Sequence, residues 1–302
     1  MSNNTQILPL HRDLDVVGPA REASMPIGAL LVEAGRITGD EAEKIHEYQK
    51  KVGLPFGEAG ISMGLLTDED VRQALARQFG QASISPDAGL GKDLVAAYEP
   101  DSPAVEHLRS LRAQLMLRWF ENGSDQSALA IVSPGSGEGR SYITANLAVL
   151  FSQMGKRTLV IDADLRKPRQ HRIFGLPGKV GLSALLAGRA GAEVMCDIPQ
   201  LPGLTVLPAG VLPPNPQELL SRPAFQRLVQ SLRGMYEVIL VDTPAASAWA
   251  DAGTVAARAG AALMVTCRDR SSMPRVIKLS EDLREFGVSV VGAVLNGAGA
   301  VA

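Results

Sequence analysis

Cysteine is scarce in this chain of 302 residues, which contains only Cys196 and Cys267 and no Cys-x-x-Cys pair. Two cysteines in a chain of this length predict a reducing compartment and argue against a zinc site. A long hydrophobic run is also missing, because no stretch of about 18 apolar residues occurs, so we expect no membrane-spanning helix. The first 17 residues include Asp13 and Asp15 and no continuous apolar segment, so we expect no signal peptide.

An excess of charge of one sign is missing as well. The chain has 30 Lys and Arg residues against 32 Asp and Glu residues, with a formal net charge of -2 and a pI near 6.1. Such balance argues against general binding to nucleic acid or to an anionic membrane surface. We therefore expect that any work at a membrane is done through a partner.

An internal repeat lies near the N-terminus, where segment 27–49 is echoed by segment 56–78. Glycine, threonine and glutamine recur at matching positions of the two copies, and each copy predicts a helix, a glycine turn and a second helix. A threonine N-cap with an acidic residue three positions later is typical of the start of a helix. These pairs are Thr38 with Glu41 and Thr67 with Asp70.

Short apolar runs of β type alternate with helical stretches in the rest of the chain. Continuous apolar strands separated by helices predict a parallel sheet with helices on both faces. The runs are 129–132, 158–162, 204–207, 238–242, 262–265 and 290–296. The expected organisation is a flexible leader (1–23), a small helical repeat domain (24–82), a linker rich in turn-forming residues (83–101) and an α/β domain (102–302).

The first of these runs leads into the glycine-rich stretch "SPGSGEGRSY" (133–142), which opens a helix. Backbone N–H groups of such a turn, together with a helix N-terminus, can bind phosphate groups. Two residues depart from the pattern GxxxxGK[ST]: Pro134 replaces the first glycine and Arg140 replaces the lysine. Ser141 retains the hydroxyl that ligates magnesium. A turn of this kind can also be a mere tight connection, so the loop alone leaves both interpretations open.

Carboxylates follow two of the other predicted strands. Asp162 and Asp164 are two residues apart at the end of one strand and so face the same way, and Asp242 ends another strand as in a Walker B motif. Ligands of an open parallel sheet bind beyond the carboxyl ends of its strands. Three carboxylates and a phosphate loop at that edge predict a magnesium–nucleotide site, and hence a P-loop NTPase-like fold. The alternative is that the aspartates only cap helices.

Several segments resemble the bacterial tyrosine kinases that control exopolysaccharide chain length, in particular the chain-length-determinant kinases of EpsG type. They are "SPGSGEGRS", "LVIDADLRKPRQHRIFGL", "GLSALLAG", "LPAGVLPPNPQELL" and "VILVDTP". The resemblance covers about residues 100–297. It implies a P-loop protein-tyrosine kinase without narrow acceptor specificity, which uses ATP and Mg²⁺. It also implies a cytoplasmic protein that is recruited to the inner membrane through a partner, a transmembrane chain-length (co-polymerase) protein.

The resemblance also implies roles for the residues that match the family's motifs. The catalytic residues would be Arg140, Asp162 and Asp164. The metal ligands would be Ser141, Asp162, Asp164 and Asp242. The nucleotide would be bound by Gly135, Ser136, Gly137, Glu138, Gly139, Arg140, Ser141, Tyr142 and Asn296. Asn296, which would face the adenine, can also be read as a turn residue at the end of a strand.

Two departures from the family leave the activity open. Its members usually end in clustered tyrosines, whereas the four tyrosines here are Tyr48, Tyr98, Tyr142 and Tyr236, so we expect the acceptor on another protein. The Walker A lysine is also absent. The alternative is a kinase-inactive, ATP-dependent switch or adaptor of the ParA/MinD-like ATPase class in polysaccharide export. Those ATPases carry a lysine early in the loop, at the position of Gly135, which favours the kinase interpretation.

Two charged segments have alternative interpretations. Glu106, Arg109 and Arg112 lie along one face of an amphipathic helix (102–120), where the resemblance implies homo-oligomer formation. An ordinary solvated charge stripe would look the same. The basic segment 166–172 fits either a guide for an acidic, tyrosine-bearing tail or a solvated helix face.

The N-terminal repeat resembles the docking domain of type II secretion and type IV pilus ATPases. That resemblance implies a membrane partner, and some versions of the domain bind cyclic di-GMP. Gln49 and Gln78 match the binding version, but Pro26 and Pro55 occupy its arginine positions. Without the two guanidinium groups, docking to a protein partner is favoured over cyclic di-GMP binding.

Overall fold

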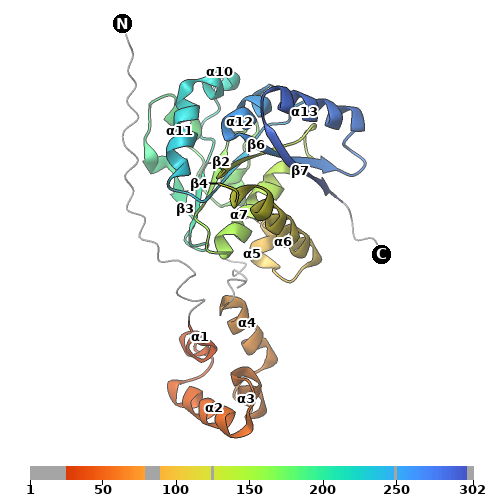
Figure 1. Ribbon diagram of the computed structural model, residues 1–302. Coiled ribbons are helices and arrows are strands. Elements are labelled where there is room, and N and C mark those ends of the chain that lie inside the picture. The colour runs from red at the N-terminus through yellow and green to blue at the C-terminus, as the bar shows by residue number, and fades with distance from the viewer. Residues whose placement is uncertain (1–24, 79–88, 124–125, 248–249, 298–302) are drawn as a thin grey trace.

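A computed structural model describes residues 25–78, 89–123, 126–247 and 250–297 (Figure 1). The first of these ranges contains four helices, and the others form an α/β domain. The expected leader (1–23) and the boundary at residue 82 lie outside the described residues, so the domain boundaries stay a prediction. No helix in the described ranges is long and apolar enough to cross a membrane.

The N-terminal repeat forms two helix pairs, as the sequence predicts. Thr38 caps its helix: its hydroxyl accepts from the N–H of Glu41 at 3.3 Å, and its own N–H donates to the Glu41 carboxylate at 2.7 Å. Thr67 and Asp70 repeat this arrangement, at 3.2 and 3.0 Å. Both predicted caps are thus confirmed. The helices are α1 (Ile27–Glu33), α2 (Gly39–Val52), α3 (Phe56–Ser62) and α4 (Asp68–Gln78).

The α/β domain is built on a seven-stranded sheet of order β3-β4-β2-β5-β1-β6-β7. All six predicted strands are present and pair in parallel. The sequence gives no sign of β3, which has two residues and pairs antiparallel with β4, because it is too short to carry an apolar pattern. The strands are β1 (Ala128–Val132), β2 (Thr158–Asp162), β3 (Cys196–Asp197), β4 (Leu204–Leu207), β5 (Val238–Asp242), β6 (Ala261–Cys267) and β7 (Ser289–Asn296).

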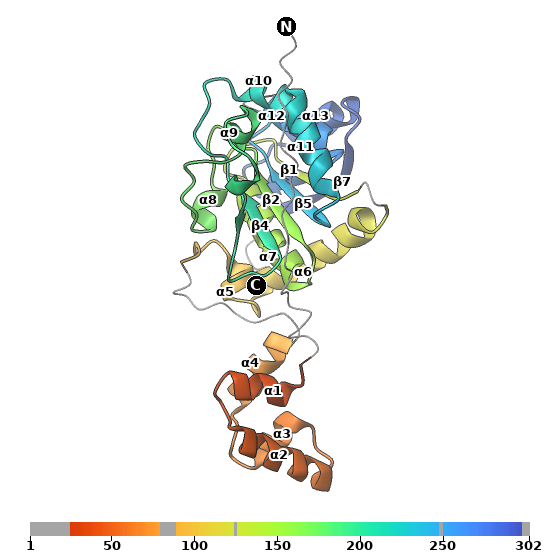
Figure 2. The same cartoon turned by 90° about the vertical axis from the view of Figure 1, so that its left-hand side faces the viewer.

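Helices cover both faces of the sheet, as expected (Figures 1 and 2). Alternate residues of β1 enter opposite cores: Ala128, Ala130 and Val132 enter one, and Leu129 and Ile131 the other. One core includes residues of α9 (Leu182–Leu186), η2 (Ala192–Val194), α10 (Pro216–Ser221), α11 (Pro223–Arg233), α12 (Asp251–Ala259) and α13 (Met273–Glu285). The other includes residues of α5 (Val95–Tyr98), α6 (Pro103–Leu115), η1 (Met116–Phe120), α7 (Arg140–Gln153) and α8 (Gln170–Ile173).

The described part of the expected linker differs from that expectation. Leu94, Ala96 and Ala97 have no exposed surface and belong to the core beside α7. The N–H of Ala96 donates to the Asn146 side chain of α7 at 2.9 Å. Residues 94–97 therefore pack within the α/β domain, although the sequence favoured a linker to residue 101, and the domain boundaries themselves stay a prediction. Turn-forming residues dominate this segment, so the sequence did not indicate that its short apolar part, around Leu94, Ala96 and Ala97, packs against α7.

Candidate active site

The glycine-rich loop between β1 and α7 closes on itself through its own acidic residue. The N–H of Gly135 donates to the Glu138 carboxylate at 2.6 Å, and Glu138 is buried. Gly139 has a φ of 100° and packs so tightly that an added Cβ would lie 1.9 Å from the Asn296 amide nitrogen. Only glycine fits at this position. The contacts of Glu138 and the close packing of Gly139 thus help to define the shape of the loop.

Three residues at the ends of β6 and β7, on the side of β1 away from β5, hold this loop in place. Asn296, at the end of β7, donates to the carbonyl of Glu138 at 3.0 Å. After β6, Ser271 donates to the Glu138 carboxylate at 2.5 Å and Arg270 to the carbonyl of Gly137 at 3.0 Å. The sequence did not indicate Arg270 or Ser271, since an Arg-Ser pair after a strand has no recognisable pattern. Facing the adenine stays a prediction for Asn296.

Arg140 is buried at the first turn of α7 and points into the protein. Its Nε donates to the carbonyl of Thr243, beyond β5, at 2.8 Å, and its Nη1 donates to the carbonyl of Gly135 at 2.7 Å and to the Ser133 hydroxyl. The guanidinium therefore joins the two ends of the loop to the strand that carries Asp242. Burial raises the pKa of Asp242, and the charge of Arg140, which lies beside that carboxyl, opposes part of this rise.

The structure brings the strand-end carboxylates together. Asp162 and Asp242 are register partners on neighbouring strands, and neither is exposed. Burial raises the pKa of Asp242 to about 6, and burial together with the Asp242 charge raises the pKa of Asp162 well above its ordinary value. Asp164 accepts hydrogen bonds from the N–H groups of Arg166 and Lys167 at 3.1 and 2.8 Å.

One polar residue that the sequence did not indicate connects these groups. Gln170, the first residue of α8, is fully buried. Its side-chain amide donates to Asp242 at 2.7 Å and to the carbonyl of Ser141 at 3.2 Å. A glutamine within the basic segment 166–172 has no pattern that could reveal partners so distant in sequence.

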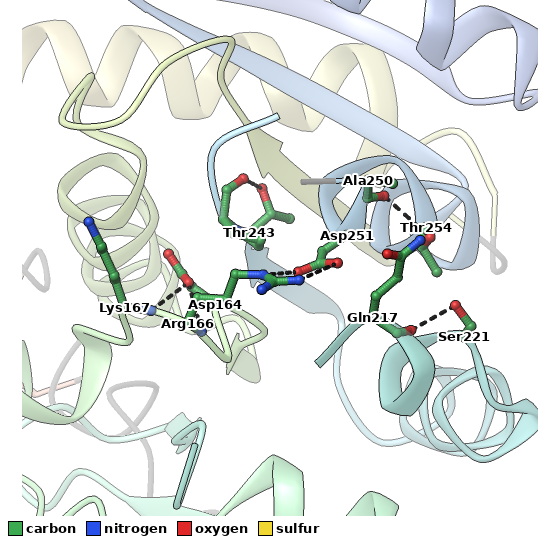
Figure 3. A network of polar contacts seen from close by, with 10 residues as sticks. Asp164, Arg166, Lys167, Gln217, Ser221, Thr243, Ala250, Asp251 and Thr254 are labelled. Atoms are coloured by element: carbon green, nitrogen blue, oxygen red, sulfur yellow. Dashed lines mark hydrogen bonds and ion pairs between the residues drawn. The ribbon is translucent and has the colours of Figure 1, made fainter. Parts of the chain in front are cut away.

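A pocket of about 430 Å³ lies beside the loop, within the size range of small-molecule sites. Asp164 lines it, whereas Asp162 and Asp242 are not among its lining residues and have no exposed surface. Figure 3 shows Arg166 beside Asp164, where its side chain reaches Asp251 of α12 at 2.6 Å. The lining residues are Ser136, Gly137, Gly139, Arg140, Ser141, Tyr142, Asp164, Arg166, Lys167, Arg169, Pro244 and Ala245.

The residues at this edge fit a magnesium ion that takes few ligands from protein side chains and the rest from waters and phosphate oxygens. Across the described ranges, no group of three His, Cys, Asp or Glu side chains is arranged to hold a metal ion by itself. One oxygen of Asp242, Oδ1, is nevertheless buried without a hydrogen-bond partner there, and the Ser141 side chain lies beside the same carboxylate. Mg²⁺ is usually bound through one or two carboxylates, substrate phosphates and several waters, and such a shell would satisfy this oxygen.

A glycine-rich loop between β1 and α7, with Asp242 at the end of the adjacent β5, defines the class of P-loop nucleotide-binding proteins. The family of CobQ/CobB/MinD/ParA nucleotide binding domains matches residues 129–299. The chain belongs to this family and, within it, to the bacterial tyrosine-protein kinases, as its relatives show.

Two curated relatives and one solved structure illustrate this membership. The chain is 39% identical to EpsB of Ralstonia solanacearum over 206 residues, which cover 68% of the chain and 27% of EpsB. It is 34% identical to the tyrosine-protein kinase YwqD of Bacillus subtilis, covering 69% of the chain and 87% of that protein. The kinase domain of Escherichia coli tyrosine kinase ETK superposes with a TM-score of 0.66 at 31% identity, over 69% of this chain and 81% of that one. The chain thus spans about a quarter of EpsB.

Proposed function

We propose that this protein is a cytoplasmic protein-tyrosine kinase that uses Mg–ATP and regulates exopolysaccharide chain length with a transmembrane partner. One observation carries the proposal: the glycine-rich loop and Asp164 line the same pocket, and two buried carboxylates, Asp162 and Asp242, end the neighbouring strands β2 and β5. The kinship with tyrosine-protein kinases supports this activity over that of a simple ATPase.

The nucleotide phosphates would be bound by backbone N–H groups of the loop and by the N-terminus of α7. Ser141 and Asp242 would hold Mg²⁺, which when bound neutralises charge on the phosphate oxygens. Asp164 would accept the proton of the acceptor tyrosine, because it lines the pocket. Asp162 is less suited to that task, since burial and the Asp242 charge favour its protonated form.

Asp164→Asn is expected to lower tyrosine phosphorylation by about 10²- to 10⁴-fold, the usual contribution of a general base, while ATP binding is retained. Phosphotyrosine on a Glu–Tyr copolymer and ATP turnover should be measured on the same purified sample. Asp101→Asn, at an exposed position, is the matched control. ATP turnover by the parent without phosphotyrosine would indicate the switch class instead, and full activity in Asp164→Asn would contradict the role of Asp164.

Self-association through α6 is part of the proposal, and the structure refines which residue is available for it. Arg109 pairs with Glu106 at 3.2 Å and its side chain is 16% exposed, whereas that of Glu106 is 68% exposed. Arg112 donates to the carbonyl of Leu150 in α7 at 3.1 Å, and burial lowers its pKa. The arginines therefore also support packing within the chain, and Glu106 is the residue of this group best placed to meet a second copy.

Glu106→Arg is expected to reduce the assembly size in the presence of ATP with at most a small loss of thermal stability, because the Glu106 side of its ion pair with Arg109 is largely exposed and such pairs contribute little. Light scattering after gel filtration measures the assembly, and high salt should weaken the parent assembly as well. Glu121→Arg makes the same change at an exposed position just beyond η1. An assembly unchanged by Glu106→Arg would rule out this interface.

The helical repeat would recruit the protein to its membrane partner. Its two capped helix pairs share a core that contains Leu31, Ile45, Ala59 and Leu66. Pro26 and Pro55 each precede the first helix of a copy and offer no capping side chain. Docking to a protein rather than to cyclic di-GMP remains the favoured role, because proline cannot make the contacts of a guanidinium group.

A further inference from the structure

Gln170 lies where three elements of the active site meet. Its N–H donates to Asp162 at the end of β2 at 3.0 Å. Its side-chain Nε2 donates to Asp242 at the end of β5 at 2.7 Å and to the carbonyl of Ser141 in α7 at 3.2 Å. A single residue thus contacts both buried carboxylates and the first turn of the phosphate-loop helix.

The orientation of the Gln170 amide follows from its partners. Nε2 has two acceptors, and a flipped amide would place its oxygen against both of them. Oε1 is therefore the remaining atom, and it is buried with no hydrogen-bond partner among the described residues. The Oδ1 atom of Asp242 is in the same situation. Buried acceptors without donors are rare in folded proteins and call for an explanation.

We propose that Gln170 is a positioning residue of the magnesium site, whose Nε2 orients Asp242 and whose Oε1 accepts a hydrogen bond from a water bound to the ion. This inference rests on the proposed Mg–ATP function. Magnesium keeps several waters when it binds to proteins, and each of them donates hydrogen bonds. The two unpaired oxygens at this site supply the acceptors that such a shell requires. Groups that orient metal ligands in this way strongly affect metal affinity.

A purely structural role does not account for this side chain. Ile173, the last residue of α8, enters the apolar core, so this helix can be anchored by an apolar residue. A buried amide that satisfies a carboxylate but leaves its own oxygen unpaired adds little to packing alone.

The test measures how Mg²⁺ affects nucleotide affinity rather than activity. Binding of a fluorescent ADP analogue to the full chain is titrated in EDTA and at increasing Mg²⁺. For Gln170→Leu we expect the affinity in EDTA to match that of the parent, and the Mg²⁺ concentration for the half-maximal effect to rise by about ten- to a hundredfold. Gln217→Leu makes the same change at an exposed position of α10 and should behave like the parent.

The possible outcomes separate this inference from the proposed function. An unchanged Mg²⁺ requirement in Gln170→Leu would overturn the inference, as would an equal loss of affinity in EDTA and in Mg²⁺, which indicates a structural role. If the parent itself shows no Mg²⁺ effect, the proposed Mg–ATP function fails, and the inference with it. Gln170→Met, which is unbranched like glutamine, gives a second measurement if the leucine variant does not fold, with the same expectations.

Discussion

Arg140→Ala is expected to abolish Mg–ATP binding and turnover, whereas Arg140→Lys should bind ATP within about tenfold of the parent, or about 1.4 kcal/mol. In the alanine variant, the carbonyls of Gly135 and Thr243 lose their guanidinium donor. Each buried acceptor left unpaired costs about 1–3 kcal/mol. Asp242 also loses the positive charge that opposes the rise of its pKa on burial. The loop is therefore expected to lose both its shape and its positive charge.

Lysine is expected to replace arginine in part, because it keeps the charge as a compact group with three donors. Transfer of phosphate depends more strongly on placement than binding does, since a shift of about 1 Å can cost about a hundredfold in rate. The lysine is the residue that phosphate loops usually carry, so we expect Arg140→Lys to preserve or raise turnover.

Calorimetric titration of ATP in Mg²⁺ measures this effect, and Arg189→Ala, at an exposed position after α9, is the control for the loss of an arginine. Thermal melting in the absence of nucleotide shows how much of the effect is on stability. If Arg140→Ala binds Mg–ATP as tightly as the parent, this loop is not the phosphate site.

Asp242→Asn is expected to stabilise the nucleotide-free protein at neutral and alkaline pH by about 3 kcal/mol, while it impairs Mg–ATP binding. Burial raises the pKa of Asp242 from 3.8 to about 6. A rise of that size corresponds to about 3 kcal/mol of free energy between the two protonation states. The active site thus carries a cost in stability that a ligand with positive charge can offset.

The dependence of stability on pH follows from the direction in which folding changes the pKa of Asp242. The folded protein binds the Asp242 proton more tightly than the unfolded chain, so this group stabilises the fold below pH about 4. That contribution is lost as pH rises through about 6, where the buried carboxyl must ionise. Asparagine does not titrate. The free energy of unfolding of Asp242→Asn should therefore rise above that of the parent between these two pH values, and the difference should stay constant at higher pH.

Urea unfolding at pH about 4 and pH about 8, without nucleotide, measures the difference in free energy of unfolding. Asp101→Asn, at an exposed position, should show no such dependence on pH. Equal stabilities of the parent and Asp242→Asn at both pH values would show that Asp242 is not held in a costly environment.

The amino-acid sequence by itself determined the strands, the loop and the meeting of the carboxylates. Continuous apolar runs predicted six strands, because a strand buried on both faces needs apolar side chains at every position. Asp162 and Asp242 end two of these runs, and the carboxyl ends of parallel strands meet at one edge, so their proximity followed from their places in the sequence. The helix caps at Thr38 and Thr67 were also local features.

Only the tertiary structure decided which polar groups contact one another. Arg140 reaches a carbonyl 103 residues away, and Gln170 reaches a carboxylate 72 residues away. The packing of residues 89–101 on α7 and the partial cover of Arg109 and Arg112 also depend on surfaces made by distant segments. Periodicity along a chain reports whether a side chain faces the core, because burial repeats with the helix or strand. It does not report the partner of a buried polar group, because that partner is set by how the elements pack.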